Sequence, residues 1–385
     1  MIYLDNAATS CPKPSRVVQA VTHTLEEVCA NPGRGAYDTA LEAGRTLLHA
    51  RRAVARLCGI RDESRVIFTL NATQALNMAL KGLLAESGGH VVTSSLEHNA
   101  VLRPLVALAR NGVTFSRVPC AADGSTDPDD VLAALTPATR LVALTHASNV
   151  LGTVLPVAEV GAALRERGIP LLVDAAQTAG SFPLDVDAMG IDLLALPGHK
   201  GLLGPQGVGV LWVGPDLRLD TLFEGGTGNE SASPDAPEGL PDRHEAGTPN
   251  TPGVAGLRAG VELVLEQGVD VIGARERALA DRLRRRLADV EGVRLAGPPA
   301  GVGAAPVVSV EVVGMSSAEA AFVMDRAFGI AVRAGLHCCP EAHRVAGTLE
   351  HGLVRCSVGH ATTEADVDAA AEALTEITVK IAAKS

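Results

Sequence analysis

Short apolar runs alternate with amphipathic segments through the middle of the chain. Seven runs of six to eight mostly apolar residues are typical of buried strands: 65–70, 90–95, 113–119, 140–147, 170–176, 192–197 and 208–213. Apolar positions at helical spacing predict helices between them, at 74–86, 127–135 and 157–168. Because parallel strands need crossover helices, the alternation predicts an α/β fold with a mostly parallel seven-stranded sheet covered on both faces.

The pattern changes after about residue 255. Two long helices are predicted at 252–268 and 275–287. After them, strands at 306–313 and 353–359 alternate with helices at 316–329 and 363–382. Such mixing predicts a smaller α+β domain. We therefore expect a large domain at 16–254 and a small domain made of 1–15 and 255–385. The segment 229–250 is dense in Pro, Gly, Ser and acidic residues, which predicts a long surface loop.

Composition limits the class of protein. A chain of 385 residues is too long for one compact core, and no apolar run reaches the length of a membrane span. Neither a charged n-region nor an apolar h-region opens the sequence, so we expect a cytoplasmic protein without a membrane partner. The net charge of −11 argues against a nucleic-acid partner. Seven scattered cysteines indicate reduced thiols rather than a disulfide framework.

Lys200 is the most informative residue, because lysine is scarce in this chain. It ends the apolar run 191–200 and precedes a glycine-rich turn. It is either a surface lysine at a strand end or a buried amine that forms a Schiff base. Asp174 favours the second interpretation, since it ends another buried strand at the sheet edge where α/β folds bind ligands. An aspartate for a pyridinium nitrogen and a Schiff-base lysine are what pyridoxal phosphate (PLP) needs most.

Two further strand ends carry candidate chemistry. Ala72 and Thr73 open a helix directly after a strand, so their backbone N–H groups could hold a phosphate, although the motif by itself favours ordinary N-capping. His98 follows the next strand, where it is either structural or stacked on a cofactor as a proton carrier.

The segment 333–343 contains two adjacent cysteines, Cys338 and Cys339, between a glycine and a proline. Arg333 and His337 are close in sequence and could lower the pKa of a thiol. Two alternatives are a pair of buried structural cysteines and a zinc site made of His337, Cys338, Cys339 and His343. Adjacent cysteines are poor ligands for one zinc ion and the chain has no CxxC pair, so we expect no metal.

Taken together, nine segments resemble the cysteine desulfurases of the class V aminotransferase group, nearly from end to end and in the right order. They are DNAAT (5–9), NATQALN (71–77), SSLEHNAVLRP (94–104), NVLGT (149–153), VDAAQ (173–177), GHKGLLGPQG (198–207), EAGTPN (245–250), RAGLHCCP (333–340) and VRCSVG (354–359). The resemblance implies PLP as cofactor and the PLP-dependent fold type I, with the large and small domains given above.

The resemblance also implies roles for the residues at the matching positions. Lys200 would form the internal aldimine, Asp174 would pair with the pyridine nitrogen and Gln177 would contact the phenolic oxygen. His98 would stack on the ring and act in catalysis. Thr73 and His199 would hold the phosphate, helped by Thr248 from a second subunit, which implies a homodimer.

On the substrate side, the resemblance implies that Asn149, Arg333 and Arg355 bind the substrate, with Arg355 on its carboxylate. Cys338 would be the nucleophile. Two positions depart from the family pattern: Pro197 stands where a serine often donates to the phosphate, and Cys339 stands where a small apolar residue usually follows the nucleophile.

The sequence thus predicts a PLP-dependent cysteine desulfurase. Its substrate would be L-cysteine, its product L-alanine, and its Cys338 persulfide would pass sulfur to an acceptor protein or thiol. One alternative is a selenocysteine lyase or another class V PLP lyase, which would share every PLP residue. Another is a non-enzymatic thiol- or zinc-binding module on an inherited fold.

Overall fold

The large sheet holds the seven strands that the apolar runs predict. The computed structural model describes residues 1–33, 35–230 and 232–383. The strands are β2 (Val66–Thr69), β3 (His90–Ser94), β4 (Thr114–Val118), β5 (Thr139–Thr145), β6 (Leu171–Asp174), β7 (Leu193–Pro197) and β8 (Gly209–Val213). Their order is β2-β8-β7-β6-β5-β3-β4, and only β8 runs antiparallel to its neighbours. The predicted α/β fold class is confirmed.

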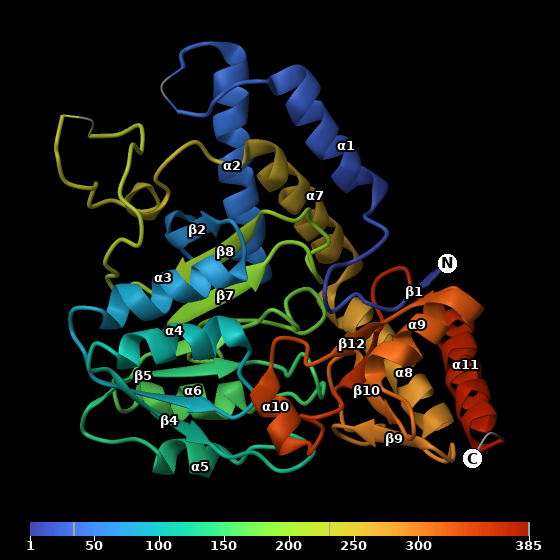
Figure 1. Cartoon of the computed structure of the whole chain (residues 1–385). Helices are drawn as coiled ribbons and strands as arrows, with labels where there is room; N and C mark the ends of the chain where they lie inside the picture. The colour runs from blue at the N-terminus through green and yellow to red at the C-terminus, as the bar shows by residue number, and fades with distance from the viewer. Residues whose placement is uncertain (34, 231, 384–385) are drawn as a thin grey trace.

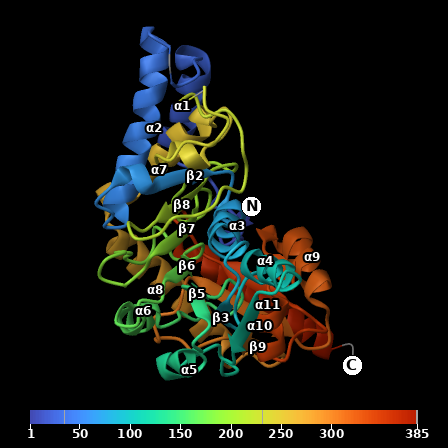
Figure 2. The same cartoon turned by 90° about the vertical axis from the view of Figure 1, so that its left-hand side faces the viewer.

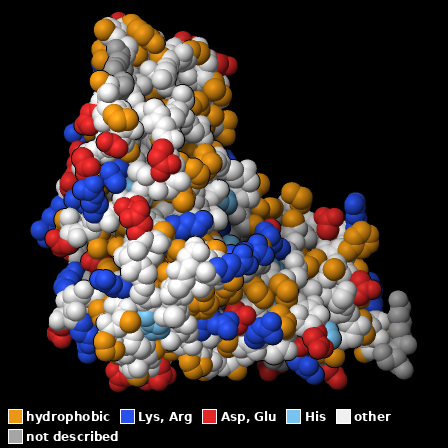
Figure 3. All heavy atoms as spheres, turned by 60° about the vertical axis from the view of Figure 1, so that its left-hand side comes forward, with side chains coloured by type: hydrophobic (Ala, Val, Ile, Leu, Met, Phe, Trp, Pro, Cys, Tyr) orange, Lys and Arg blue, Asp and Glu red, His pale blue; other side chains and the backbone are white. Residues whose placement is uncertain are grey.

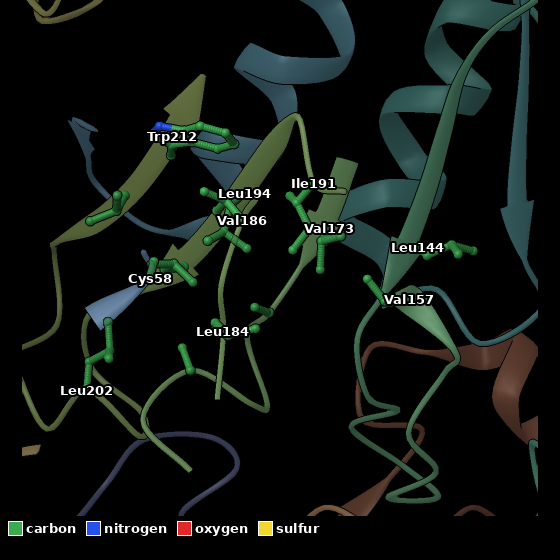
Figure 4. Close-up of a cluster of buried hydrophobic side chains, with 14 of the residues drawn as sticks. Cys58, Leu144, Val157, Val173, Leu184, Val186, Ile191, Leu194, Leu202 and Trp212 are labelled. Atoms are coloured by element: carbon green, nitrogen blue, oxygen red, sulfur yellow. The ribbon is translucent and has the colours of Figure 1, made fainter. Parts of the chain in front are cut away.

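Both faces of this sheet are buried along its central strands, which explains why these are mostly apolar, whereas the edge strand β4 is partly exposed. Successive residues point to opposite faces: Leu172 and Leu193 enter one core cluster, Val173 and Leu194 the other. Figure 4 shows Val173 and Leu194 in the second cluster, close to other labelled apolar side chains. Helices cover the faces, among them α3 (Ala72–Leu84), α4 (Asn99–Ala109), α5 (Pro128–Ala133) and α6 (Val157–Arg165).

A second sheet of four antiparallel strands lies beside the first (Figure 1). In the order β12-β13-β10-β9 its strands are Arg333–Gly335, Leu353–Ser357, Val307–Val312 and Val293–Ala296. Packed on it are α8 (Val269–Leu287), α9 (Ser317–Phe328) and α11 (Glu364–Ala382). Leu4 enters the same core because β1 (Ile2–Tyr3) pairs with β11 (Ile330–Ala331). The extreme N-terminus thus packs with the C-terminal third of the chain.

Three further helices form a projection above the large sheet, which Figures 1 and 2 show from two sides. They are α1 (Ser15–His23), continued by the π-helical turn η1 (Thr24–Val28), α2 (Asp38–Leu57) and α7 (Thr251–Gln267). The domain boundary predicted at 254/255 falls in the first turn of α7, and the division into domains stays a prediction.

The described part of 229–250 is exposed or half-buried except at Pro237, as expected for the predicted surface loop, and contains only the short turn η3 (Asp242–His244). The other short elements are η2 (Glu63–Arg65) and α10 (Pro340–Val345). None of the helices in the described ranges is long and apolar enough to cross a membrane.

Candidate active site

The carboxyl ends of β5, β6 and β7 bring polar side chains to one edge of the large sheet. Thr145 and Asp174 are paired across β5 and β6, and Lys200 follows β7 by three residues. The Asp174 carboxylate is 4% exposed and accepts a hydrogen bond from the backbone N–H of Ala176 at 3.0 Å. Burial raises the pKa of Asp174, while the positive charge of Lys200 acts in the opposite direction.

Lys200 is held as a weakly basic amine. Burial lowers its pKa from the ordinary 10.5 to about 8, against the opposing effect of the Asp174 carboxylate. Across the described residues, Nζ makes no hydrogen bond or ion pair. The backbone at this point is fixed instead, because the carbonyl of His199 accepts hydrogen bonds from Ser10 N at 2.9 Å and Lys13 Nζ at 2.9 Å. The amine of Lys200 is therefore unpaired, while the backbone next to it is held in place.

A cavity of about 210 Å³ gathers eleven of the twelve residues that the sequence predicts for the site. They are Ala72, Thr73, His98, Asn149, Asp174, Gln177, His199, Lys200, Arg333, Cys338 and Arg355. The twelfth, Thr248, lines a separate cavity of about 290 Å³ beside β2. This position is compatible with the predicted role of Thr248 in the site of a second subunit, which stays a prediction.

One end of the cavity is suited to an anion. Asn71 caps α3 by accepting from Gln74 N at 2.9 Å, which leaves the N–H groups of Ala72 and Thr73 without an acceptor in the described chain. These N–H groups lie at the positive end of the helix dipole. The ring Nδ1 of His199 is also buried without a hydrogen-bond partner. Burial lowers the pKa of His199 to about 4, so its ring is neutral at physiological pH.

His98 caps α4 with its own ring. Its Nδ1 accepts a hydrogen bond from the backbone N–H of Ala100 at 3.0 Å, so the neutral ring carries its proton on Nε2. Burial, together with the nearby charges of Lys200 and Arg103, lowers the pKa of His98 to about 4. A neutral, oriented imidazole therefore faces the cavity.

Two arginines from the small sheet also line the cavity. Arg333 of β12 and Arg355 of β13 are paired across the two strands. Arg355 is 2% exposed; its guanidinium donates to Asp5 Oδ1 at 2.8 Å and to the carbonyl of Asn149 at 3.1 Å, while its Nε has no partner. One unpaired donor of Arg355 and the exposed guanidinium of Arg333 suit a substrate carboxylate.

Cys338 and Cys339 have opposite environments. Cys338 is exposed and lines the cavity. Cys339 is fully buried, and its Sγ lies 3.3 Å from the carbonyl of Leu96 and 3.1 Å from that of Glu97. Burial raises the pKa of the Cys339 thiol to about 12, so it stays protonated. The structure therefore favours Cys338 as the reactive thiol of the pair.

The turn that presents Cys338 is held from several directions. His337 and Cys338 both have positive φ, at 50° and 59°, a conformation that non-glycine residues adopt at a cost of roughly 1–3 kcal/mol each. The side chain of Asn149 donates to the carbonyl of His337 at 2.7 Å, and Asn99 N donates to the carbonyl of Cys338 at 2.9 Å. His337 Nε2 also contacts the carbonyl of Leu353 at 3.1 Å. These contacts compensate for the backbone strain.

Comparison with known proteins settles the family. The family model for the class-V aminotransferases matches residues 2–370 of this chain. The chain belongs to the class-V aminotransferase family. The family that the sequence predicts is therefore confirmed.

Three similar proteins are named as cysteine desulfurases or probable cysteine desulfurases. A probable cysteine desulfurase of Methanothermobacter thermautotrophicus is 35% identical over 381 residues, covering 98% of this chain and 94% of the relative. A cysteine desulfurase of Cereibacter sphaeroides is 34% identical over 398 residues, covering 100% and 97%. The apo structure of a cysteine desulfurase from Thermococcus onnurineus NA1 superposes with a TM-score of 0.93 at 32% identity, covering 98% and 95% of the two chains.

Class-V aminotransferases are PLP-dependent as a family, and the residues present fit that cofactor. An orphaned, buried His199 Nδ1 lies in the same cavity as the free N–H groups that open α3, as a phosphate requires. The buried Asp174 carboxylate suits a protonated ring nitrogen, and the unpaired Lys200 amine suits a carbonyl carbon. Pro197 also lines the cavity, at the position where the family often has a serine. Because proline has no side-chain donor, the N–H groups that open α3 and the ring of His199 would have to hold the phosphate.

Sequence reasoning did not assign several residues that shape the site. Asp5 holds Arg355, and its segment was singled out only as part of a family motif. Glu97 lies buried under the site, where its Oε1 accepts from Ser94 Oγ at 2.6 Å and Thr145 N at 3.0 Å. His337 was considered as a ligand or a tuner of the thiol. Burial lowers the pKa of His337 to about 3, which leaves its ring a neutral support.

The zinc alternative finds no support in the contacts of its four predicted ligands. The sulfur of Cys339 is directed at backbone carbonyls, and His337 and His343 stack with ring centroids 5.7 Å apart. Over the described ranges, no group of three or more His, Cys, Asp or Glu side chains is arranged to hold a metal ion.

Proposed function

We propose that this protein is a PLP-dependent cysteine desulfurase that converts L-cysteine to L-alanine and keeps the sulfur as a persulfide on Cys338. The observation that carries the proposal is that an exposed thiol, Cys338, and an unpaired amine, Lys200, line one cavity. A lysine for PLP alone would be compatible with amino transfer, decarboxylation or elimination. A thiol in the same cavity points to sulfur chemistry.

The cofactor would be held by residues already described. Ala72, Thr73 and His199 would bind its phosphate, Asp174 its ring nitrogen, and Lys200 would attach to it covalently, while Gln177 and His98 flank the ring. Bound in this way, PLP would supply an electron sink that makes the α-proton of the substrate acidic and weakens the carbon–sulfur bond of the substrate.

The protein residues perform the binding and proton steps. Arg355 and Arg333 orient the substrate through its carboxylate. Lys200, with a pKa of about 8, is present both as neutral amine and as ammonium near neutral pH, so its Nζ can take the α-proton and later return a proton to the product carbon. A lysine with an ordinary pKa of 10.5 would be protonated more than 99% of the time and would be a poor base.

The sulfur step uses Cys338. Its thiolate attacks the substrate sulfur, a sulfur–sulfur bond forms, and the substrate carbon–sulfur bond breaks with its electron pair left on carbon. Protonation of that carbon gives alanine, and the enzyme retains the persulfide. Cys339 does not compete, because its buried thiol is protonated.

We further propose that the enzyme is cytoplasmic and works as a homodimer, in which Thr248 of each copy supports the phosphate site of the other. Support for this comes from the position of Thr248, which lies outside the cavity of its own chain. The persulfide sulfur would then pass to an acceptor protein or thiol.

The test is alanine production from L-cysteine by purified protein reconstituted with PLP. Wild type should form alanine and show the visible absorbance of lysine-bound cofactor. Lys200→Ala should lose both, whereas Lys380→Ala, at a surface lysine paired with Glu376, should keep both. If wild type forms no alanine from L-cysteine but turns over L-selenocysteine, the desulfurase assignment gives way to the lyase alternative.

A further inference from the structure

Cys338 lies between two hollows. It lines the cavity described above, and it also lines an outer groove of about 340 Å³ between α3 and α4. The two hollows share Thr73, His98 and Ala100 as well. A sulfur atom received on Cys338 from the inner cavity is therefore already beside the outer groove, without a movement of the helices.

The outer groove is positively charged. Arg103 of α4 and Lys81 of α3 line it, and over the described residues neither side chain forms an ion pair or a hydrogen bond. Asn77 and Asn99 add polar surface, and no acidic side chain within the described ranges lines the groove. The positive charge of this groove contrasts with the net charge of −11 of the whole chain.

Figure 3 shows one face of the molecule, on which some Lys and Arg side chains lie beside the hollow in its middle and others lie toward its edges. A positive hollow on a negative molecule attracts anions to that place. The groove volume of about 340 Å³ is at the small end of the range for small-molecule sites, so it suits a small ligand.

We propose that the α3–α4 groove binds the sulfur acceptor, and that this acceptor is a small thiol carrying a carboxylate, held by Arg103 and Lys81. The inference rests on the proposed function, because it requires a persulfide on Cys338. The acceptor thiolate attacks the outer sulfur of the persulfide. A new sulfur–sulfur bond forms, the bond to Cys338 breaks, and Cys338 leaves as a thiolate, so no external oxidant or reductant is needed.

The experiment uses the reconstituted full-length enzyme loaded with sulfur by one equivalent of L-cysteine. Transfer of the sulfur is timed with 3-mercaptopropionate, which is anionic, and with 2-mercaptoethanol, which is neutral. Each rate is measured for wild type, for Arg103→Gln, for Lys81→Gln and for the double variant. Because the variant rate is divided by the wild-type rate for the same thiol, the intrinsic reactivities of the two thiols cancel.

We expect each single substitution to slow transfer to 3-mercaptopropionate by about two- to fivefold, the effect of one exposed ion pair, and to leave transfer to 2-mercaptoethanol unchanged. High salt should remove the advantage of the anionic thiol in wild type. Arg110→Gln is the matched control, since Arg110 ends α4, is exposed and lies outside the groove.

Three results would overturn the inference in different ways. Equal losses for both thiols, or no loss for either, with alanine still formed during loading, would leave the desulfurase intact and refute the groove. Absence of alanine during loading would refute the proposed function and the groove with it. Retention of the anion preference in the double variant would place the acceptor elsewhere.

Discussion

The two adjacent cysteines should differ in reactivity by several orders of magnitude. With a pKa of about 12, Cys339 is a thiolate in only about one molecule in ten thousand at pH 8. Its sulfur also has no access to solvent, and its proton is directed at the carbonyls of Leu96 and Glu97. Cys338 is exposed and has neither constraint. We therefore expect one thiol of the pair to carry the chemistry and the other to support the turn.

Four variants separate these roles: Cys338→Ala, Cys338→Ser, Cys339→Ala and Cys339→Ser. Both substitutions of Cys338 should abolish alanine formation from L-cysteine while the cofactor absorbance remains. Cys339→Ser should keep activity, because a hydroxyl can donate to the same carbonyls. Cys339→Ala should keep the chemistry and lower the free energy of unfolding by about 1 kcal/mol, the value of one hydrogen bond.

The assay adds brief iodoacetamide treatment at pH 8 and peptide mapping by mass spectrometry. Label should appear on Cys338 and be absent from Cys339, with the exposed Cys11 and Cys29 as internal positive controls. Persulfide or alkyl label on Cys339 in the native enzyme would refute this reasoning. So would alanine formation that survives Cys338→Ala and disappears in Cys339→Ser.

Two other predictions concern the cofactor lysine and the loop that carries Thr248. As the pH rises through about 8, Lys200 becomes neutral, so PLP attachment to apoenzyme should accelerate about fivefold from pH 7 to 8 and less than twofold from 8 to 9. The visible absorbance of lysine-bound cofactor reports the rate. The reaction of N-acetyl-lysine with PLP, measured in parallel, should accelerate about tenfold for each pH unit over the same range. A tenfold acceleration per pH unit for Lys200 as well would contradict its lowered pKa. Glu245→Gln should lower the free energy of unfolding by about 3 kcal/mol, because the Arg51 and Glu245 side chains, 8% and 13% exposed, form a buried pair. Urea denaturation measures the free energy of unfolding. The control is Glu238→Gln, since Glu238 pairs with Arg218 and both side chains are about two-thirds exposed; it should change the free energy of unfolding by less than about 1 kcal/mol. Equal effects of the two substitutions would contradict the argument from burial.

The large sheet was predictable because its central strands are buried on both faces and therefore read as apolar runs. The meeting of Asp174 and Lys200 at one edge of the sheet was predictable too. Both residues lie at the ends of such runs, and parallel strands end at the same edge. By contrast, α1 and α2 were not among the predicted helices. The buried face of α2 is made mostly of alanine, which gives a weak apolar signal in sequence.

Contacts between residues far apart in the chain were beyond the reach of sequence reasoning. Asp5 and Arg355 are 350 residues apart, yet their side chains meet at 2.8 Å. Cys339 and Glu97 are 242 residues apart, and no local pattern indicates that a thiol will point at that carbonyl. Family motifs singled out all these segments without saying which of them touch.

These distant contacts join the two sheets at the active site. Asn149, just after β5, holds the cysteine turn through the carbonyl of His337, and its own carbonyl accepts from Arg355 of the small sheet. Arg355 in turn holds Asp5 of the N-terminal segment. Because contacts of this kind help to hold the strained turn at Cys338, its geometry depends on the two sheets being packed together. The reactive thiol and the cofactor lysine come from different sheets, so the packing that closes the cavity is also what brings them into it.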